Sequence, residues 1–151
     1  MCDLQKRQEQ LEIALKTLSL PEGIQLRAWQ EADFQAIQRL TAQQGWTTPT
    51  NRPTEALLAW RHSWPALVVT EGEQVIGFVR ALTDGEVTTY IADLLVDPRY
   101  RRRGLGRLLV EACHALYPHT RLDLISEEDA VPFYRREGFR ELGPGMRKSF
   151  R

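Results

Sequence analysis

An arginine- and glycine-rich segment, residues 97–107, lies between a predicted strand and a predicted helix. The apolar strand ends at Val96, Pro98 cannot continue a ladder of hydrogen bonds, and the helix that follows is apolar on one face. Gly104 and Gly106 let the backbone approach a ligand closely, and the first-turn amides of the helix then point outward without partners. These amides, the helix dipole and the neighbouring arginines together favour the binding of a polyphosphate.

Other phosphate-binding loops fit this segment less well. A nucleotide P-loop ends in Lys-Ser or Lys-Thr, and the segment contains neither pair; the dinucleotide fingerprint needs a third small residue where Leu109 stands. The simplest alternative is a solvated run of arginines at the start of an ordinary helix.

Two motifs resemble those of a known family. The spacing Arg101-x-x-Gly104-x-Gly106 resembles the pyrophosphate-binding motif of the GCN5-related N-acetyltransferase (GNAT) superfamily, whose members hold acetyl-CoA. Downstream, residues 130–139 resemble the family's Ala-x-x-Phe-Tyr-x-x-x-Gly-Phe motif, and the two motifs occur in the family's order. The resemblance implies that acetyl-CoA is the co-substrate and that its diphosphate is bound by Arg101, Arg102, Arg103, Gly104, Leu105, Gly106 and Arg107.

The resemblance also implies how acetyl-CoA is activated. In the family the Tyr of the second motif lies beside the sulfur of CoA and protonates the departing thiolate, so Tyr134 is the expected general acid. The alternative is that Tyr134 is half of a Phe-Tyr core pair. Backbone groups of Leu94, Leu95 and Val96 are expected to bond the pantetheine arm and the acetyl group, and to supply an oxyanion donor.

The acceptor amine needs a base and a pocket. Asp93 is the expected base, with Asp123 as the second candidate, and a carboxylate that merely bonds nearby backbone is the alternative for Asp93. Trp46 and Tyr90 are expected to form walls of the acceptor pocket. Where the family often has an Asn that bonds the CoA arm, this chain has Glu127, and the acidic run 127–129 is most simply a helix cap and first turn.

Composition narrows the class of protein. The 151 residues contain 20 basic and 20 acidic side chains, so the chain has no net field that would attract nucleic acid or an anionic membrane. Cys2 and Cys113 do not suggest a disulfide framework, and His62, His114 and His119 lack the spacing of metal ligands, so no metal is expected. Without an apolar signal or a membrane-spanning run, a cytoplasmic location is expected.

The hydrophobic pattern predicts an α/β fold of a single domain, with a central mixed, twisted sheet of about seven strands flanked by helices, and the resemblance implies that this fold is GNAT-like. An N-terminal extension, residues 1–22, forms an extra amphipathic helix that packs on its own chain or pairs with a second copy as a homodimer, and the N-acetyltransferase domain spans residues 23–151. Trp60 and Trp64, four residues apart, are expected in the core. The predicted strands are 24–28, 66–70, 74–82, 88–96 and 122–125, with a final hairpin of 139–142 and 146–150; the helices after the extension are 33–44, 54–62, 104–117 and 130–137.

Together these observations predict an N-acetyltransferase that moves an acetyl group from acetyl-CoA to a primary amine of a small molecule by direct attack in a ternary complex. The alternatives are a non-catalytic acyl-CoA-binding regulatory module and an enzyme that acetylates a protein or peptide amine. Nucleic-acid binding through the arginines of residues 99–107 is a weaker hypothesis because the net charge is zero. No membrane partner is expected.

Overall fold

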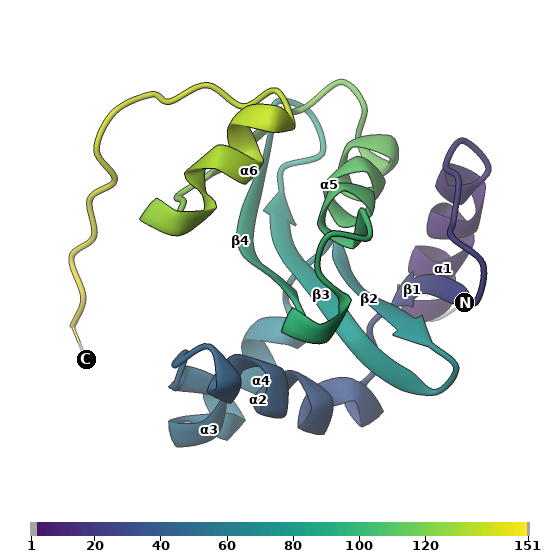
Figure 1. Ribbon diagram of the computed structural model, residues 1–151, viewed down its shortest axis with the longest axis horizontal. Helices are drawn as coiled ribbons and strands as arrows, with labels where there is room; N and C mark the ends of the chain where they lie inside the picture. Colours follow the sequence, from purple (N-terminus) through teal and green to yellow (C-terminus); the bar gives the residue numbers. More distant parts are fainter. Residues whose placement is uncertain (1–2, 151) are drawn as a thin grey trace.

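A five-stranded sheet forms the centre of the computed structural model, which describes residues 3–150 (Figure 1). The strands lie in sequence order, and all neighbours are antiparallel except the last pair, which is parallel. A parallel pair needs a crossover between its strands, and a helix supplies it here. The strands are β1 (Ile24–Ala28), β2 (Ala66–Glu71), β3 (Gln74–Thr83), β4 (Thr88–Val96) and β5 (Arg121–Leu124).

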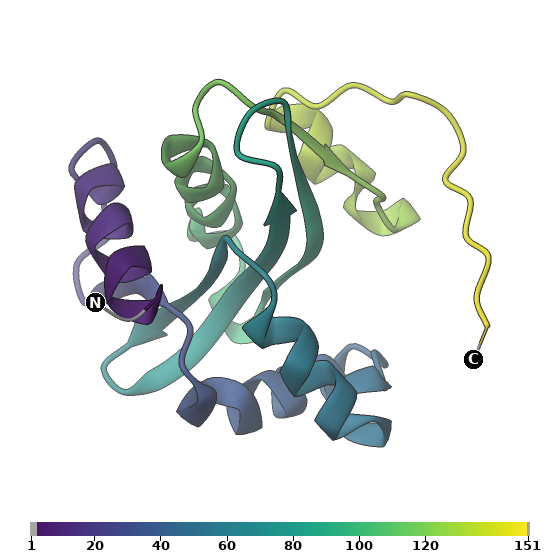
Figure 2. The same ribbon diagram turned by 180° about the vertical axis from the view of Figure 1, so that it is seen from behind.

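Helices cover both faces of this sheet (Figures 1 and 2). The crossover helix α5 and the N-terminal helix α1 lie together against one face, and three helices that follow β1 lie against the other. A short helix, α6, follows β5. The helices are α1 (Asp3–Leu15), α2 (Phe34–Gln43), α3 (Thr48–Asn51), α4 (Pro53–Arg61), α5 (Leu105–Leu116) and α6 (Val131–Arg136). In residues 3–150 no helix is both long and apolar enough to cross a bilayer.

The N-terminal helix packs on its own chain, as expected. Leu11 of α1 is fully buried in the common core, and the side chain of Gln8 accepts a hydrogen bond of 3.0 Å from the backbone of Ala28 in β1. The indole of Trp64 donates to Gln10 at 3.3 Å. Burial of Leu11 and these two hydrogen bonds therefore hold α1 against the rest of the chain.

Aromatic side chains fill the space between the sheet and α4. Trp60 packs on Phe78 of β3 and on Trp29, with ring centroids 5.4 Å apart in both pairs. Trp60 and Trp64 are both buried, which confirms their predicted place in the core. Cys113 of α5 is fully buried, and burial raises the pKa of its thiol to about 12, so it is a structural side chain. Cys2 lies outside the described residues.

The predicted sheet of about seven strands is wrong, because the final hairpin does not form. Residues 139–150 contain no strand and run away from the sheet (Figure 1). Leu142, Met146 and Phe150 are 73%, 87% and 86% exposed, so the alternating pattern has no buried face against which a strand could pack. Pro144 also lacks an amide hydrogen for a ladder. A second difference is α3, a single helical turn in a segment where no helix was predicted.

Candidate functional site

The site forms where β4 continues past its neighbour. β5 pairs with β4 only as far as Ile91, and a register shift against β3 leaves Ala92 as the extra residue of a bulge, since Asp93 and Ile91 pair with consecutive β3 residues. From Ala92 to Val96, β4 therefore has a strand neighbour on one side only. We call these residues the free edge of β4.

Backbone amides and carbonyls of successive residues in β4 point in opposite directions, so only every second residue directs these groups to the free edge. The amide of Asp97 donates to a carbonyl of β3 at 2.7 Å, so the backbone of Leu95 points the same way and that of Leu94 and Val96 points to the free edge. In agreement, the carbonyl of Val96 accepts a hydrogen bond of 3.3 Å from the Arg101 side chain, which lies outside the sheet. The amides of Leu94 and Val96 are thus the donors available beside β5.

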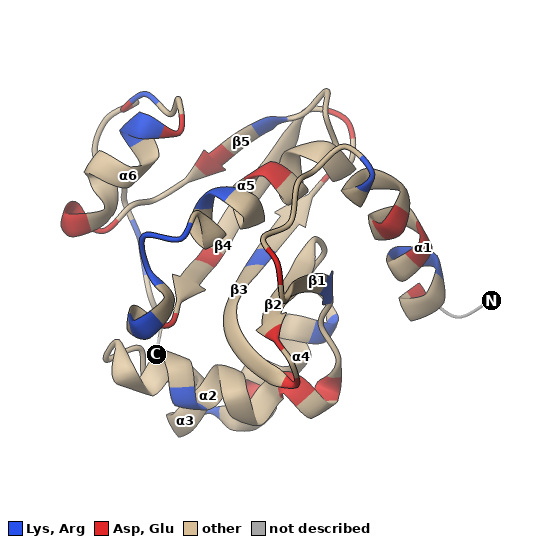
Figure 3. Ribbon diagram, turned by 45° about the vertical axis from the view of Figure 1, so that its right-hand side comes forward, with Lys and Arg blue, Asp and Glu red and all other residues tan. Residues whose placement is uncertain are grey.

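The arginine- and glycine-rich loop joins this edge to α5. Gly104 is the N-cap of α5 and has a left-handed backbone with φ of 79°, and Arg102 also has a positive φ of 65°. A Cβ atom on Gly104 would have open space around it, so the left-handed backbone, not crowding, is the reason for glycine at this position. The amides of the first turn, from Leu105 onward, face this space. Figure 3 shows the loop as a continuous basic run beside the end of β4.

Ion pairs divide the arginines into two groups. Arg99 is held by the buried carboxylate of Asp97 at 2.9 Å, and Arg107 by Glu111 at 2.8 Å. Within the described chain, by contrast, no carboxylate lies within 4.0 Å of the three arginines at positions 101–103, and all three are exposed. These three are the cations that can meet an anionic ligand without first breaking an ion pair.

Gly106 also has a packing role, which was not predicted. A Cβ atom there would lie 3.1 Å from the ring of Phe133, so the glycine makes room for α6 to pack on the start of α5. The ring of Tyr134 then lies edge-on between Phe133 and Phe139, with centroids 5.0 and 5.4 Å away. Burial and, as the smaller cause, the negative charge of Glu127 together raise the pKa of the Tyr134 hydroxyl to about 12.

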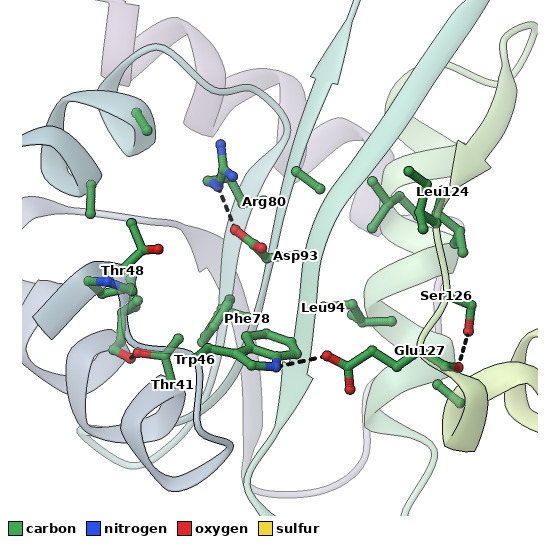
Figure 4. A pocket seen from close by; sticks show the side chains of 18 of the residues that line it. Thr41, Trp46, Thr48, Phe78, Arg80, Asp93, Leu94, Leu124, Ser126 and Glu127 are labelled. Carbon is green, nitrogen blue, oxygen red and sulfur yellow. Dashed lines mark hydrogen bonds and ion pairs between the residues drawn. The ribbon is translucent and has the colours of Figure 1, made fainter. Parts of the chain in front are cut away.

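A cavity of about 550 Å³ opens beside the free edge of β4 (Figure 4). Four residues predicted for the site line it: Trp46 from the loop after α2, Asp93 and Leu94 from β4, and Tyr134 from α6. Segments that lie far apart in the sequence therefore meet here, and they bring an aromatic wall, a carboxylate and a phenol together. The buried rings of Trp60 in α4 and Phe78 in β3 also line the cavity.

Two residues predicted for the acceptor side of the site are not brought to this cavity. Tyr90 does not line it, and neither does Asp123, which pairs with Arg121 at 3.3 Å and lines a wider groove on the outer side of β5 and α6. Both lie in the stretch where β4 and β5 are still paired, before the free edge begins.

Arg80 is a cavity residue that the sequence analysis missed. Its Nε donates to Oδ2 of Asp93 at 2.7 Å (Figure 4). Its Nη1 donates to the hydroxyl of Ser63 at 3.1 Å. The charge of Asp93 is therefore balanced by a neighbour on β3. The pair depends on the bulge at Ala92, which sets the register, and no local pattern in the sequence indicates that bulge.

Glu127 is the second missed residue. It stands at the N-cap of a short 3₁₀ turn, as the acidic run suggested, but its side chain makes no capping bond. Instead, the indole Nε1 of Trp46 donates to its Oε1 at 3.0 Å, and both side chains line the cavity (Figure 4). The departure from the family's usual Asn at this position was the one signal in the sequence that could have indicated it.

Comparison with known proteins agrees with this geometry. A family model described as an acetyltransferase (GNAT) domain matches residues 62–141. Histone acetyltransferase TAP1 of Glycine max is 30% identical over 132 residues, which cover 80% of this chain and 57% of that protein. The peptidyl-lysine N-acetyltransferase YiaC of Escherichia coli is 30% identical over 86 residues, which cover 56% of this chain and 54% of that protein.

Solved structures share the fold. A GNAT-family acetyltransferase from Streptococcus pneumoniae superposes with a TM-score of 0.71 at 27% identity, over 85% of this chain and 97% of that one. The chain spans only 31% to 57% of the length of the first curated relatives that it matches.

Proposed function

The chain belongs to the family of GNAT acetyltransferase domains, and we propose that it transfers an acetyl group from acetyl-CoA to a primary amine. One observation carries the proposal: the free edge of β4 lies between a basic loop at a helix start and a cavity that contains a phenol and two carboxylates. The loop suits a diphosphate, the edge suits a thioester carbonyl, and the cavity suits an amine. Direct attack in a ternary complex fits this arrangement, because all three components are adjacent.

Acetyl-CoA fits the residues on one side of the free edge. We assign its diphosphate to the first-turn amides of α5 and to the arginines at positions 101–103, because no carboxylate holds them. The open space at Gly104 admits such a group. We assign the amides of Leu94 and Val96 to the pantetheine arm and the acetyl carbonyl, since donors aimed at a developing oxyanion are a large source of rate enhancement. No metal has a role in this proposal.

Tyr134 and Asp93 lie on the acceptor side. We propose that Tyr134 protonates the departing thiolate, because its raised pKa keeps the phenol protonated at neutral pH. Asp93 was the predicted base, but Arg80 already balances its charge and occupies one of its oxygens. We therefore assign Asp93 the role of orienting the acceptor amine beside the free edge.

The acceptor that we propose is a primary amine of a small molecule. A cavity of about 550 Å³ lies in the size range of small-ligand sites, and its walls combine indole rings with carboxylates, which suits a protonated amine on a short carbon chain. The lysine side chain of a peptide presents the same group, and two relatives are named for histone and peptidyl-lysine acetylation, so a peptide is the second candidate. A cytoplasmic location remains a prediction.

Release of free thiol from acetyl-CoA tests this function. The assay uses a panel of polyamines, amino sugars, amino acids and lysine-containing peptides, together with calorimetric titration of acetyl-CoA without an acceptor. Release with small amines supports the first acceptor class, and release with peptides alone supports the second. Saturable binding of acetyl-CoA without any thiol release would favour the regulatory module. If acetyl-CoA does not bind at all, the proposal is wrong.

A further inference from the structure

A hydrogen bond connects the two sides of the cavity. Trp46 reaches in from the loop between α2 and α3, and Glu127 reaches in from the segment between β5 and α6, 81 residues further along the chain. Figure 4 shows the two side chains pointing toward each other in front of β4. The indole donates to Oε1 of Glu127, and in residues 3–150 no donor bonds Oε2. One oxygen of the positioned carboxylate is therefore available to an acceptor.

The two carboxylates of the cavity, Asp93 and Glu127, differ in whether a neighbouring cation balances their charge. Asp93 is neutralised by Arg80 at 2.7 Å, whereas within residues 3–150 no cationic group lies within 4.0 Å of Glu127, whose partner Trp46 is neutral. Arg147 of the C-terminal segment is the other cation that lines the cavity. An incoming ammonium group is therefore attracted to Glu127, because this carboxylate lines the cavity and no cation within 4.0 Å balances its charge.

Glu127 also lies close to the expected general acid. Its charge is the second cause, after burial, of the raised pKa of Tyr134, and both residues line the same cavity. The carboxylate and the phenol thus share the end of the cavity at α6. A base and an acid on the same side of a reacting carbonyl can serve the attacking nitrogen and the departing sulfur in one geometry.

We propose that Glu127 binds the ammonium group of the acceptor and takes its proton, and that Trp46 positions this carboxylate beside the free edge of β4. The inference rests on the proposed acetyl transfer and names the acceptor class as an amine that is protonated at neutral pH. The carbon chain that carries the amine lies against the indole face of Trp46, which also attracts a cation.

The proton balance follows from this assignment. Oε2 of Glu127 takes one proton from the ammonium group and passes it to solvent, which leaves a lone pair on nitrogen. The bond between nitrogen and the acetyl carbon forms, the bond between that carbon and sulfur breaks, and Tyr134 gives its proton to the sulfur. The second proton on the nitrogen replaces the one that Tyr134 lost. The products are an amide, a free thiol and one proton.

Glu127→Gln is the direct test, with Glu128→Gln as the matched control. Gln keeps the size of the side chain and an oxygen that can accept from Trp46, and it loses the charge and the ability to take a proton. Glu128 is also an exposed acid, does not line the cavity and is adjacent in sequence. With spermidine and a single-lysine peptide as probes, we expect kcat/KM to fall on the order of 10²-fold for Glu127→Gln and less than about twofold for Glu128→Gln.

The pH dependence separates a proton acceptor from a structural residue. As the pH rises toward the pKa of an alkyl amine, about 10.4, more acceptor is already neutral and needs no base, so the deficit of Glu127→Gln should shrink. Arg80, Asp93, Arg147 and Tyr134 face the same cavity and are unchanged in this variant. A Trp46→Phe variant keeps Glu127, so its rate should fall while its pH profile keeps the wild-type shape.

The following results would contradict the role of Glu127 as base or the proposed function itself. If Glu127→Gln retains wild-type kcat/KM, or if its deficit is the same at every pH, Glu127 is not the base. If the affinity for acetyl-CoA falls by the same factor as kcat/KM, Glu127 belongs to the CoA site instead, and the inference is again wrong. A wild-type protein that acetylates no amine contradicts the proposed function itself, and calorimetric binding of acetyl-CoA distinguishes that outcome from the first two.

Discussion

Replacing Tyr134 with Phe removes one hydroxyl from the cavity and leaves the aromatic packing in place. The ring lies edge-on to Phe133 and Phe139, and in the described residues its hydroxyl makes no hydrogen bond on which the fold depends. We therefore expect the free energy of unfolding to change by less than about 1 kcal/mol. Loss of a general acid should lower kcat on the order of 10²-fold, which corresponds to roughly 2.7 kcal/mol on the barrier.

The pKa of Tyr134 determines where on the pH scale its effects appear. Burial raises this pKa from 10.0 to about 12, so the phenol keeps its proton through the neutral and mildly alkaline range. A folded-state pKa above the unfolded one means that the contribution of this group to stability is complete below about pH 10 and is lost as the pH rises through about 12. The difference in tyrosinate absorbance between wild type and Tyr134→Phe should show one group that ionises near the upper value.

Two measurements on wild type and Tyr134→Phe test the role of Tyr134. Steady-state thiol release at saturating acetyl-CoA gives kcat, and calorimetry gives the Kd for acetyl-CoA, which should not change. Tyr117→Phe is the matched control, because Tyr117 caps the end of α5 and does not line the cavity. Full kcat in Tyr134→Phe would refute the role of Tyr134 as general acid. An equal loss of acetyl-CoA affinity would show that the hydroxyl binds the co-substrate rather than protonating the thiolate.

Three further substitutions test the elements that position the site. Gly104→Val forces a β-branched residue into a left-handed backbone with φ of 79°, so thermal denaturation should show a loss of at least about 1–2 kcal/mol and calorimetry a weaker affinity for acetyl-CoA; unchanged affinity would contradict the placement of the diphosphate. Gly106→Leu places a branched side chain against the ring of Phe133, which lies 3.1 Å from the position of its Cβ, and overpacking there should cost about 1–3 kcal/mol in denaturant unfolding, whereas wild-type stability would show that α6 does not pack as described. Asp97→Asn weakens the charged bonds to the backbone and side chain of Arg99, so stability should fall by about 1–2 kcal/mol at neutral pH. The hydrogen-bonded ion pair with Arg99 lowers the pKa of Asp97 below 3.8. The contribution of Asp97 to stability is therefore present above pH 3.8 and is lost as the pH falls through the folded-state pKa. Urea titrations at several pH values should show this acid-dependent loss in the wild type and not in Asp97→Asn.

Most of the secondary structure could be predicted because it depends on local patterns. The strands 24–28 and 88–96 begin and end as predicted, and the parallel pairing of β4 with β5 follows from the helix between them. The loop with Gly104 could also be found, since left-handed backbone and a helix start have sequence signatures of a few residues. The final hairpin could not be predicted, because a strand needs a neighbouring edge and a buried face, and alternation in residues 139–150 specifies neither.

Local patterns in the sequence were sufficient to predict the order of the five strands, the basic loop before α5 and the Phe-Tyr motif of α6. Tertiary structure alone decided that Arg80 balances Asp93, that Gly106 makes room for an aromatic ring of α6, and that Trp46 holds Glu127 across the cavity. The physical reason is the range of the interactions. Backbone conformation follows from neighbours within a few residues, whereas the charge and proton affinity of a site depend on side chains that only the folded chain brings within hydrogen-bonding distance.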